Sequence, residues 1–261
     1  MQGCVSPTCD DLGRPVALPR AVRRVVSLVP SLTEAVAATA PGLLVGATDW
    51  CTHPAELPVV RIGGTKSPSV PAVLDLQPDL VVASEEENRA VDLDALRAAG
   101  VAVWVTAPET VPAALLSLER MLAACGLDRP AWLEQAAAVW SGPAPTASGR
   151  RPTVRRRAVV PIWRRPWMAL GRDTFAGDLL SRLRVDNVLA GSPERYPRIE
   201  LAALPPYDLV VLPDEPYSFG ADDGPEAFPE VPAALVSGRH LTWYGPSLVE
   251  AHDVLRRQLD V

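Results

Sequence analysis

The sequence predicts an α/β protein with two Rossmann-like lobes, each built around a mostly parallel central sheet. The first observation is a repeat, because residues 76–89 and 204–217 both contain a proline, an aspartate, an apolar run and then carboxylates. An uninterrupted apolar run bounded by turn formers is typical of a strand buried on both faces of a parallel sheet. Ligands bind at the carboxyl ends of such strands. We therefore expect a ligand-binding loop in each lobe and a ligand cleft between the lobes.

The second observation is the composition. The chain has 261 residues, 48% of them apolar, which is enough for the cores of two small α/β domains. Its formal net charge of −6 gives no electrostatic case for binding nucleic acid. No run reaches the roughly 18 apolar residues of a membrane span, and no signal peptide precedes the first lobe. We therefore expect a cytoplasmic protein; the alternative is an extracytoplasmic lipoprotein whose true start lies upstream of Cys4.

The first lobe is expected at residues 20–110. Its expected strands, besides the repeated one, are at 23–29, 43–47 and 101–106, and its helices follow residue 31 and lie at 70–76 and 91–99. Ser31 and Glu34 have the spacing of a capping box, which predicts that the first helix begins directly after the first strand. The loop after the second strand carries Trp50 and His53.

Residues 111–152 are expected to form a helical connection, with helices at 111–125 and 129–140 followed by a Pro/Gly/Ser linker at 141–149. The second lobe is expected at residues 153–261. Its predicted elements are strands at 154–162 and 232–236, the repeated strand between them, and helices at 175–183 and 247–259.

The seven tryptophans divide into two groups. Three lie in strand or helix patterns and are expected in the core: Trp104, Trp132 and Trp140. Four directly follow predicted strands, beside Pro, Arg or His residues that resist full burial: Trp50, Trp163, Trp167 and Trp243. Because ligand pockets favour aromatic walls with a few polar groups, we expect the second group to line the ligand cleft.

With these pieces in order, the chain resembles the class III substrate-binding proteins of ABC importers, the helical backbone metal receptor superfamily. The motifs that carry the resemblance are at residues 24–34, 63–64, 76–81, 171–174 and 186–188. Members of this superfamily capture cobalamin, ferric siderophores or heme. Within it, the chain is similar to the cobalamin-binding branch, and to a signal-less subgroup with motifs that stand here at residues 86–89, 163–168 and 243–245.

The resemblance and the aromatic loops together imply a set of ligand-binding residues. We expect it to consist of Ser31, Trp50, His53, Lys66, Glu86, Asn88, Arg89, Trp163, Arg164, Trp167, Asp173, Glu215, Tyr217, Trp243 and Tyr244. The arginines expected to pair with carboxylates or amides of the ligand are Arg89, Arg164, Arg165 and Arg239. The expected ligand is a corrinoid or another chelated-metal or tetrapyrrole compound, and the chain is expected to be a monomer.

The chain also departs from the family pattern. The family's lobes are joined by one long helix, whereas the helix at 129–140 is followed here by a linker. The family's first-lobe glutamate that contacts a permease falls near Pro71, while Glu200 is in place for the second. An alternative function is therefore a cytoplasmic enzyme, ligand chaperone or sensor that uses the acidic loops at 85–87 and 214–215, where adjacent carboxylates separate their pKa values. With three histidines, a bare-metal site is not expected.

Overall fold

The computed structural model describes residues 9–141 and 155–260, so most of the expected linker lies outside the described residues. The chain divides into two compact units. Unit 1 consists of Met1–Pro108, Ala114–Gln135 and Tyr244–Pro246, and unit 2 of Glu109–Ala113, Ala136–Trp243 and Ser247–Val261. Each unit is an α/β structure with its own parallel sheet, which confirms the predicted fold class.

The strands, with their bounds, are β1 Val25–Ser27, β2 Leu44–Ala47, β3 Val60–Arg61, β4 Gly63–Gly64, β5 Ser67–Pro68, β6 Leu80–Ser84, β7 Val103–Thr106, β8 Arg156–Val159, β9 Pro161–Arg164, β10 Trp167–Ala169, β11 Val185–Asn187, β12 Leu209–Pro213 and β13 Ala233–Val236. The α-helices are α1 Pro30–Thr39, α2 Val70–Asp75, α3 Ala90–Ala98, α4 Val111–Ala124, α5 Ala131–Ser141, α6 Phe175–Arg182, α7 Gly238–Thr242 and α8 Leu248–Leu259. The single-turn 3-10 helix η2 spans Leu201–Ala203.

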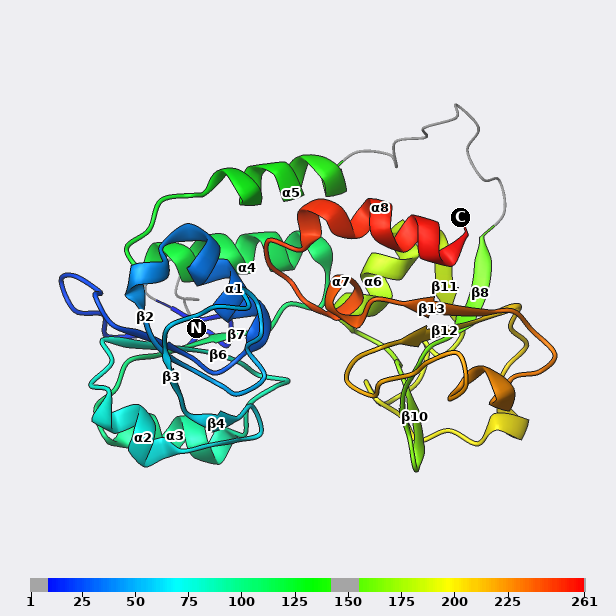
Figure 1. Ribbon diagram of the computed structural model, residues 1–261, viewed down its shortest axis with the longest axis horizontal. Coiled ribbons are helices and arrows are strands. Elements are labelled where there is room, and N and C mark those ends of the chain that lie inside the picture. Colours follow the sequence, from blue (N-terminus) through cyan, green and yellow to red (C-terminus); the bar gives the residue numbers. More distant parts are fainter. Residues whose placement is uncertain (1–8, 142–154, 261) are drawn as a thin grey trace. The chain divides into compact units, whose positions relative to one another are not determined.

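The sheet of unit 1 has the strand order β3-β2-β1-β6-β7, and all its neighbouring strands pair in parallel. Helices α1 and α4 lie on one side of it and α2 and α3 on the other (Figure 1). Every residue of β6 is buried, as its uninterrupted apolar run predicts for a strand covered on both faces.

The main sheet of unit 2 has the order β11-β8-β12-β13 and is also fully parallel. Strand β12 is the repeat of β6 and is likewise buried along its whole length. The two copies of the repeated motif therefore form central strands of two separate sheets. This confirms the interpretation of the repeat as one central strand in each lobe.

The capping box expected at Ser31 and Glu34 is wrong. Helix α1 begins at Pro30, its N-cap residue is Val29, and no side chain caps it. Proline at the first helical position is pre-organised for the helix and lacks the N–H that would otherwise stay unpaired. The helix therefore starts two residues earlier than a cap at Ser31 would give, and Ser31 and Glu34 are buried residues within it.

Trp163 and Trp167 do not lie in a loop, as we expected, but in a β-hairpin. Strands β9 and β10 pair antiparallel, with Met168 opposite Trp163. Arg165 and Pro166 form the two-residue turn between them. Short runs rich in aromatic residues on either side of a two-residue turn favour such a hairpin. The segment expected as a loop before α8 also contains the short helix α7.

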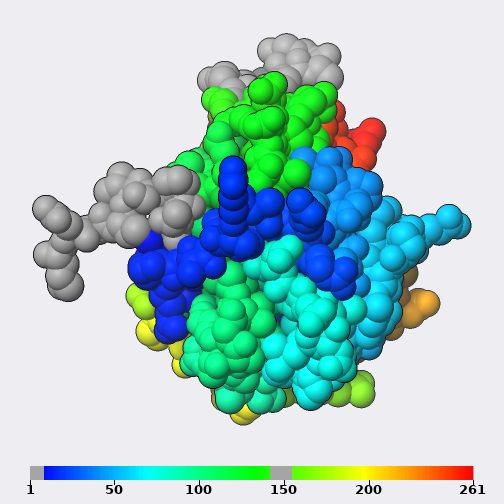
Figure 2. All heavy atoms as spheres, turned by 90° about the vertical axis from the view of Figure 1, so that its left-hand side faces the viewer, coloured from blue at the N-terminus to red at the C-terminus, as the bar shows by residue number. Residues whose placement is uncertain are grey.

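The N-terminal segment is fixed to unit 1. Figure 2 shows it in dark blue, crossing this face of the unit above the cyan residues. Asp11 accepts from Arg120 Nη1 at 2.9 Å and from the backbone N–H of Ala107 at 3.0 Å, while the buried Asp10 lies 4.0 Å from Arg97 Nη2. Burial raises the pKa of the Asp10 carboxyl, and this outweighs the backbone N–H groups that lower it.

No Cys or His spacing in the sequence indicates a disulfide or zinc site, so we expected free thiols, but Cys9 is disulfide-bonded. Cys51 and Cys125 are free and buried. The core predictions for tryptophan are confirmed for Trp104 and Trp140, which are buried. Trp132 is half-buried, and its indole N–H donates to Thr39 Oγ1 at 3.0 Å.

Candidate functional site

Both sheets have a topological switch point beside the repeated strand. In unit 1, β1 lies between β2 and β6, and in unit 2, β8 lies between β11 and β12. The chain leaves the first strand of each sheet toward one side and later returns on the other side. Ligands of open α/β sheets bind in the crevice at the carboxyl ends of the two strands that flank such a point. The loops after β1 and β6 are therefore the candidate site of unit 1, and those after β8 and β12 are the candidate site of unit 2. These four loops are here called the switch-point loops.

The switch point of unit 1 is held by the buried side chain of Asn88. Its Oδ1 accepts from the backbone N–H of Ser84, at the end of β6, at 2.9 Å. Its Nδ2 donates to the carbonyl of Leu28, just after β1, at 3.2 Å and to that of Thr65 at 2.9 Å. Only a side chain with both a donor and an acceptor can join loops in this way. Both amide hydrogens are used, so a ligand-binding role of Asn88 stays a prediction.

Trp50 is presented on the surface by a loop that is fixed from below. Its side chain is 67% exposed, while the next residue, Cys51, is buried. The Cys51 sulfur lies 3.0 Å from Thr33 Oγ1 and 3.1 Å from Thr48 Oγ1. Arg61 Nη1 donates to the carbonyls of Thr48 and Cys51, both at 2.8 Å. The loop backbone is thus held at both ends of the turn, and the Trp50 ring is available for contact.

The acidic loop after β6 carries one local counter-charge. Lys66 Nζ donates to the carbonyl of Glu86. The Glu87 side chain is exposed, yet desolvation by the atoms packed around this loop raises its pKa. The positive charge of Lys66 opposes this rise in pKa, and the negative charge of Glu86 adds to it. His53 is half-buried, with its Nδ1 atom 3.2 Å from Thr52 Oγ1. Lys66, Glu86 and Glu87 thus share one stretch of surface in unit 1.

Besides Asn88, two more of the residues expected to bind a ligand are buried within unit 1. Ser31 lies in the first turn of α1, and the Tyr244 side chain is only 7% exposed. The Tyr244 hydroxyl lies 2.9 Å from Thr106 Oγ1, at the end of β7. Burial raises the pKa of Tyr244. The sequence pattern could not show the burial of Tyr244, because its partner Thr106 lies 138 residues away along the chain.

The switch point of unit 2 carries aromatic rings. Trp163, on β9, is 44% exposed, and its ring meets Tyr217 edge to face, with centroids 5.6 Å apart and an angle of 79° between the planes. Tyr217, in the loop after β12, in turn packs on Phe219 at 4.6 Å. Edge-to-face pairs at this separation are favourable because the ring edge is positive and the face negative. The pair therefore presents part of the Trp163 ring to solvent in a supported orientation.

A polar network holds this aromatic pair from the side. Tyr217 Oη donates to Asp223 Oδ2 at 2.6 Å, and Arg164 forms ion pairs with both Asp223 and Glu226. The hydrogen bond from Tyr217, and then Arg164, hold the pKa of Asp223 below its usual value. The same hydrogen bond raises the pKa of Tyr217. Arg164 is thus already paired with carboxylates of its own unit.

Trp167, opposite Arg164 in the hairpin, belongs to the core side of this aromatic group. Its ring is stacked on Phe219 at 6.0 Å with an interplanar angle of 4°, and meets Phe228 edge to face at 5.6 Å. The Arg164 guanidinium lies 5.3 Å from the ring centroid. Trp167 is half-buried and packs against the hydrophobic core of unit 2.

Trp243 is buried, contrary to our expectation that charged neighbours would keep it exposed. Its side chain is 8% exposed, and its indole N–H donates to Glu215 Oε2 at 3.0 Å. The adjacent acid, Asp214, accepts from the backbone N–H of Gly238 at 2.6 Å. A carboxylate partner for the indole N–H makes this burial possible. Both acids of the second acidic loop thus hold groups of their own unit.

The remaining predicted contacts lie on the surface. Arg89 Nε lies 3.4 Å from Asp92 Oδ2 and stays largely exposed. Asp173 has a left-handed backbone, with φ of 50°, and its exposed carboxylate lies 3.4 Å from Arg172 Nε. Arg165, at the tip of the hairpin, is exposed and makes no ion pair within the described residues. Arg239 pairs with Glu250 at 3.2 Å, whereas the charge of Arg165 acts on Asp223 from a distance and lowers its pKa.

Sequence reasoning missed the partners that support this site. Asp223 and Glu226 pair with Arg164 across a separation of 59 residues in the first case, and Phe219 and Phe228 enclose Trp167. The one available signal was the acidic turn at 222–226. It could not be assigned, because nothing in the sequence shows which cation such a turn will meet.

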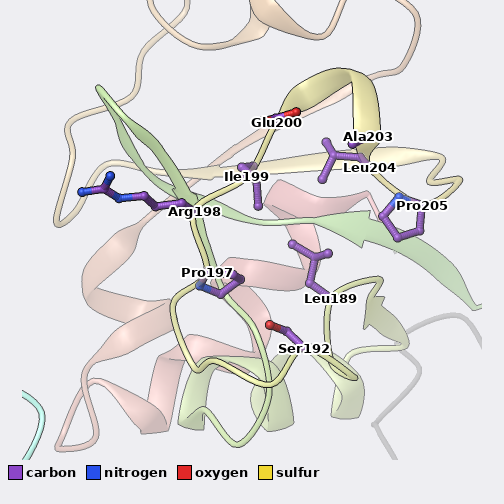
Figure 3. A pocket seen from close by; sticks show the side chains of 9 residues that line it. All are labelled: Leu189, Ser192, Pro197, Arg198, Ile199, Glu200, Ala203, Leu204 and Pro205. Carbon is purple, nitrogen blue, oxygen red and sulfur yellow. The ribbon is translucent and has the colours of Figure 1, made fainter.

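Unit 2 also has a pocket of about 350 Å³ away from the switch-point loops. Figure 3 shows the side chains of Leu189, Ile199 and Leu204 converging on it, with Arg198 pointing away. None of the predicted ligand residues lines it, but Glu200 does, at its rim. Its lining residues are Leu189, Ser192, Pro197, Arg198, Ile199, Glu200, Ala203, Leu204 and Pro205.

Within residues 9–141 and 155–260, no group of three or more His, Cys, Asp or Glu side chains could hold a metal ion. Over the same described residues, no helix is long and apolar enough to cross a membrane.

The chain has two α/β units, each with polar or aromatic switch-point loops. This is the architecture of two-lobed binding proteins. The sequence profile of the periplasmic binding protein family matches residues 25–205, and the chain belongs to this family. The resemblance to class III substrate-binding proteins is therefore confirmed. Among curated protein sequences, none matches this chain.

Solved structures share the fold. The periplasmic heme-binding protein RhuT from Roseiflexus sp. RS-1, in apo form, has a TM-score of 0.71 at 22% identity, over 91% of this chain and 98% of that protein. The periplasmic vitamin B12-binding protein BtuF of Vibrio cholerae has a TM-score of 0.69 at 16% identity, over 93% and 98%. CeuE of Helicobacter pylori has a TM-score of 0.77 at 14% identity, over 96% and 86%. At these identities the likeness concerns the fold.

Proposed function

We propose that the protein binds a flat chelated-metal or tetrapyrrole ligand, of the cobalamin or heme kind, as the solute-binding component of an ABC importer. The observation that carries this proposal is the half-exposed ring of Trp163, supported edge-on by Tyr217 at the switch point of unit 2. An aromatic face stacked on a planar ring contributes roughly 1 to 3 kcal/mol to binding. Similar folds described as heme- and vitamin B12-binding proteins support this choice of ligand class.

Arg165 supplies the second element of the proposed site. It lies in the turn two residues after Trp163, is exposed, and forms no ion pair within the described part of the chain, although its charge lowers the pKa of Asp223. Arg164 is held by Asp223 and Glu226, so it is less available. A guanidinium recognises carboxylates through paired hydrogen bonds, which suits the acidic side chains of tetrapyrroles. Within unit 1, Trp50 and Arg89 are likewise exposed.

Titration of hemin, cyanocobalamin and a ferric siderophore against four proteins tests this proposal. These are the wild type, Trp163→Ala, Arg165→Gln and the control Trp132→Ala. We expect Trp163→Ala to weaken binding by about tenfold to a hundredfold, the equivalent of 1 to 3 kcal/mol. Arg165→Gln should weaken only ligands that carry carboxylates, and Trp132→Ala should change none of the affinities. Unchanged affinity in Trp163→Ala would place the ligand elsewhere.

A catalytic role for the two acidic loops is the alternative. One observation favours it, namely the raised pKa of Glu87 in an exposed loop, which suits a general acid. Against it, Asp214 and Glu215 hold the Gly238 N–H and the Trp243 indole, so the second loop offers no free base. Turnover of a metabolite panel that is lost in Glu87→Gln and kept in Trp163→Ala would favour catalysis over binding.

We also propose an extracytoplasmic location and a monomeric state. The family's name places its members in the periplasm, which does not support the cytoplasmic location expected from the sequence. The disulfide at Cys9 supports the same conclusion, because such bonds are rare in reducing compartments. Glu200, exposed at the rim of the unit 2 pocket, is the proposed contact for a permease, whereas Pro71 offers no charge. Cell fractionation and light scattering of the purified chain test location and oligomeric state.

A further inference from the structure

The three residues Tyr244–Pro246, here called the strap, belong to unit 1, although the residues on both sides of them belong to unit 2. The chain therefore passes from unit 2 into unit 1 after Trp243 and returns after Pro246. No motif in the sequence indicates this excursion. The contacts of the strap and of its two flanking segments show what it holds.

The Tyr244 hydroxyl is the middle member of a buried chain of hydroxyl groups. Thr106 Oγ1 donates to the carbonyl of Ala83 at 3.0 Å, so its only proton is in use. Tyr244 therefore donates to Thr106 Oγ1, at 2.9 Å, and Ser84 makes a further hydrogen bond to the Tyr244 oxygen. Hydrogen bonds in such a chain polarise one another and strengthen together. The strap is thus anchored to the carboxyl ends of β6 and β7, where the acidic loop begins.

The next residue of the strap packs directly on the first turn of α1. A Cβ atom added to Gly245 would lie 3.0 Å from the backbone oxygen of Ser31. Glycine is the residue that allows this close backbone approach. The strap therefore covers Ser31 and touches the carboxyl ends of three strands of unit 1, namely β1 through this turn, β6 and β7.

Both flanks of the strap are fixed in unit 2. Before it, the Trp243 indole donates to Glu215 Oε2, in the switch-point loop after β12. After it, Ser247 is buried, and the carbonyl of Leu248 accepts from Trp140 Nε1 at 2.9 Å. The loop after β12 is therefore linked to Tyr244 by the Glu215–Trp243 hydrogen bond and the peptide bond between Trp243 and Tyr244.

We propose that the strap is a positioning device that couples the switch-point loop after β12 in unit 2 to the acidic loop after β6 in unit 1. Tyr244 is a positioning residue in this scheme, because it holds Ser84 and is itself buried. The inference rests on the proposed function and adds to it a physical link between the loop after β6 and the loop after β12. Its first tests need no ligand, so they stand whether or not a tetrapyrrole binds.

The first test is amide hydrogen exchange in Tyr244→Phe, with Tyr207→Phe as the matched control, since the Tyr207 hydroxyl has no hydrogen bond within the described residues. The probes in unit 1 are the amides of Glu85 and Asn88, which donate to Thr106 and Ser84, and the probe in unit 2 is that of Asp214. We expect about tenfold faster exchange at Glu85 and Asn88, the effect of losing one buried hydrogen bond. Exchange at Asp214 should also rise, and the control should change neither loop.

The second test separates coupling from simple stability. A Gly-Ser pair inserted between Trp243 and Tyr244 lengthens the strap but keeps both sets of contacts. In the native-length chain, Glu215→Ala should speed exchange at Glu85 and Asn88, and in the lengthened chain it should not. The proposal is overturned if Glu215→Ala leaves these amides unchanged in the native-length chain or changes them equally in both. It is also overturned if Tyr244→Phe affects unit 1 alone.

Binding provides the third readout. If hemin or cyanocobalamin binds the wild type, Tyr244→Phe should weaken that binding by about tenfold, while Tyr207→Phe leaves it unchanged. Unchanged affinity in Tyr244→Phe, with faster exchange in both loops, would remove the strap from ligand binding. Absence of binding by the wild type would instead contradict the proposed function.

Discussion

The two switch points have the same topology but are held together by different forces. In unit 1 the loops after β1 and β6 are joined by the amide of Asn88, which is buried and makes three hydrogen bonds to backbone groups. In unit 2 the hairpin after β8 meets the loop after β12 through the rings of Trp163 and Tyr217, with Asp223 and Arg164 at the side. The buried hydrogen bonds of Asn88 are here called the polar lock. The half-exposed Trp163–Tyr217 pair is here called the aromatic platform.

This difference separates folding from binding. A buried polar lock leaves backbone groups without partners when its side chain is removed, and each such group costs about 1 to 3 kcal/mol. Removing a half-exposed ring leaves groups that water can reach, so its cost to folding is small. We therefore expect substitution of Asn88 to lower stability and substitution of Trp163 to lower ligand affinity.

The largest expected effect is that of Asn88→Ala. Three backbone groups lose their partner in a buried place, so unfolding free energy should fall by about 3 kcal/mol or more. The matched control is Asn187→Ala in unit 2. Asn187 makes the same kind of contacts, to the carbonyls of Leu170 and Gly171 and the N–H of Leu189, but it is only half-buried. We expect a cost of about 1 kcal/mol there. Urea unfolding of both variants measures the difference; equal costs would mean that burial does not set the cost of losing these hydrogen bonds.

The next effect lies within the hairpin itself. Trp167 packs on Phe219 and Phe228, so Trp167→Ala should destabilise the protein by about 3 kcal/mol. Trp163, on the other strand of the hairpin, is exposed, and Trp163→Ala should lower the free energy of unfolding by less than about 1 kcal/mol. Thermal melts of the two variants check this. A Trp163→Ala variant that melts as low as Trp167→Ala would make Trp163 a core residue and remove the platform.

A smaller effect is expected in the polar network beside the platform. Tyr217→Phe keeps the ring that supports Trp163 and removes only the hydroxyl that bonds Asp223. Because this network is partly exposed, we expect only a small loss of stability. Ligand affinity should stay near that of the wild type, while Tyr217→Ala should weaken it. Equal affinity losses in the two variants would mean that the hydroxyl, and not the ring, positions Trp163.

The smallest effect is a pH dependence with opposite signs in the two units. The pKa of Asp10 is raised by burial, so above its ordinary value of 3.8 the folded state holds more protons and stability falls as the pH rises toward the folded pKa. The pKa of Asp223 is lowered by Tyr217 and Arg164. Its contribution is complete above 3.8 and is lost as the pH falls through the folded pKa.

Denaturant unfolding at several pH values, on wild type, Asp10→Asn and Asp223→Asn, tests these signs. The wild type should lose stability through Asp10 as the pH rises above 3.8, and Asp10→Asn should not show this loss. The wild type should lose stability through Asp223 as the pH falls below 3.8, and Asp223→Asn should not show that loss. Slopes that change in the same direction in both variants would contradict the assigned causes.

The sequence by itself determined the two-lobed α/β fold and its central strands. Local information is enough for this, because an apolar run between turn formers specifies a buried strand whatever its partners are. The runs at β6 and β12 are therefore visible without the tertiary structure, and so is the helix that ends before Gly100. The family resemblance followed from the same local motifs.

Only the tertiary structure decided which polar and aromatic side chains face outward. Tyr244 and Trp243 are adjacent in the chain, yet they are buried in different units, against Thr106 and Glu215. Arg164 and Arg165 are adjacent as well, yet within the described residues Arg164 forms ion pairs with an acidic turn and Arg165 forms none. The reason is physical: the burial of a polar group depends on whether a partner reaches it. In this chain those partners are 28 to 138 residues away along the sequence.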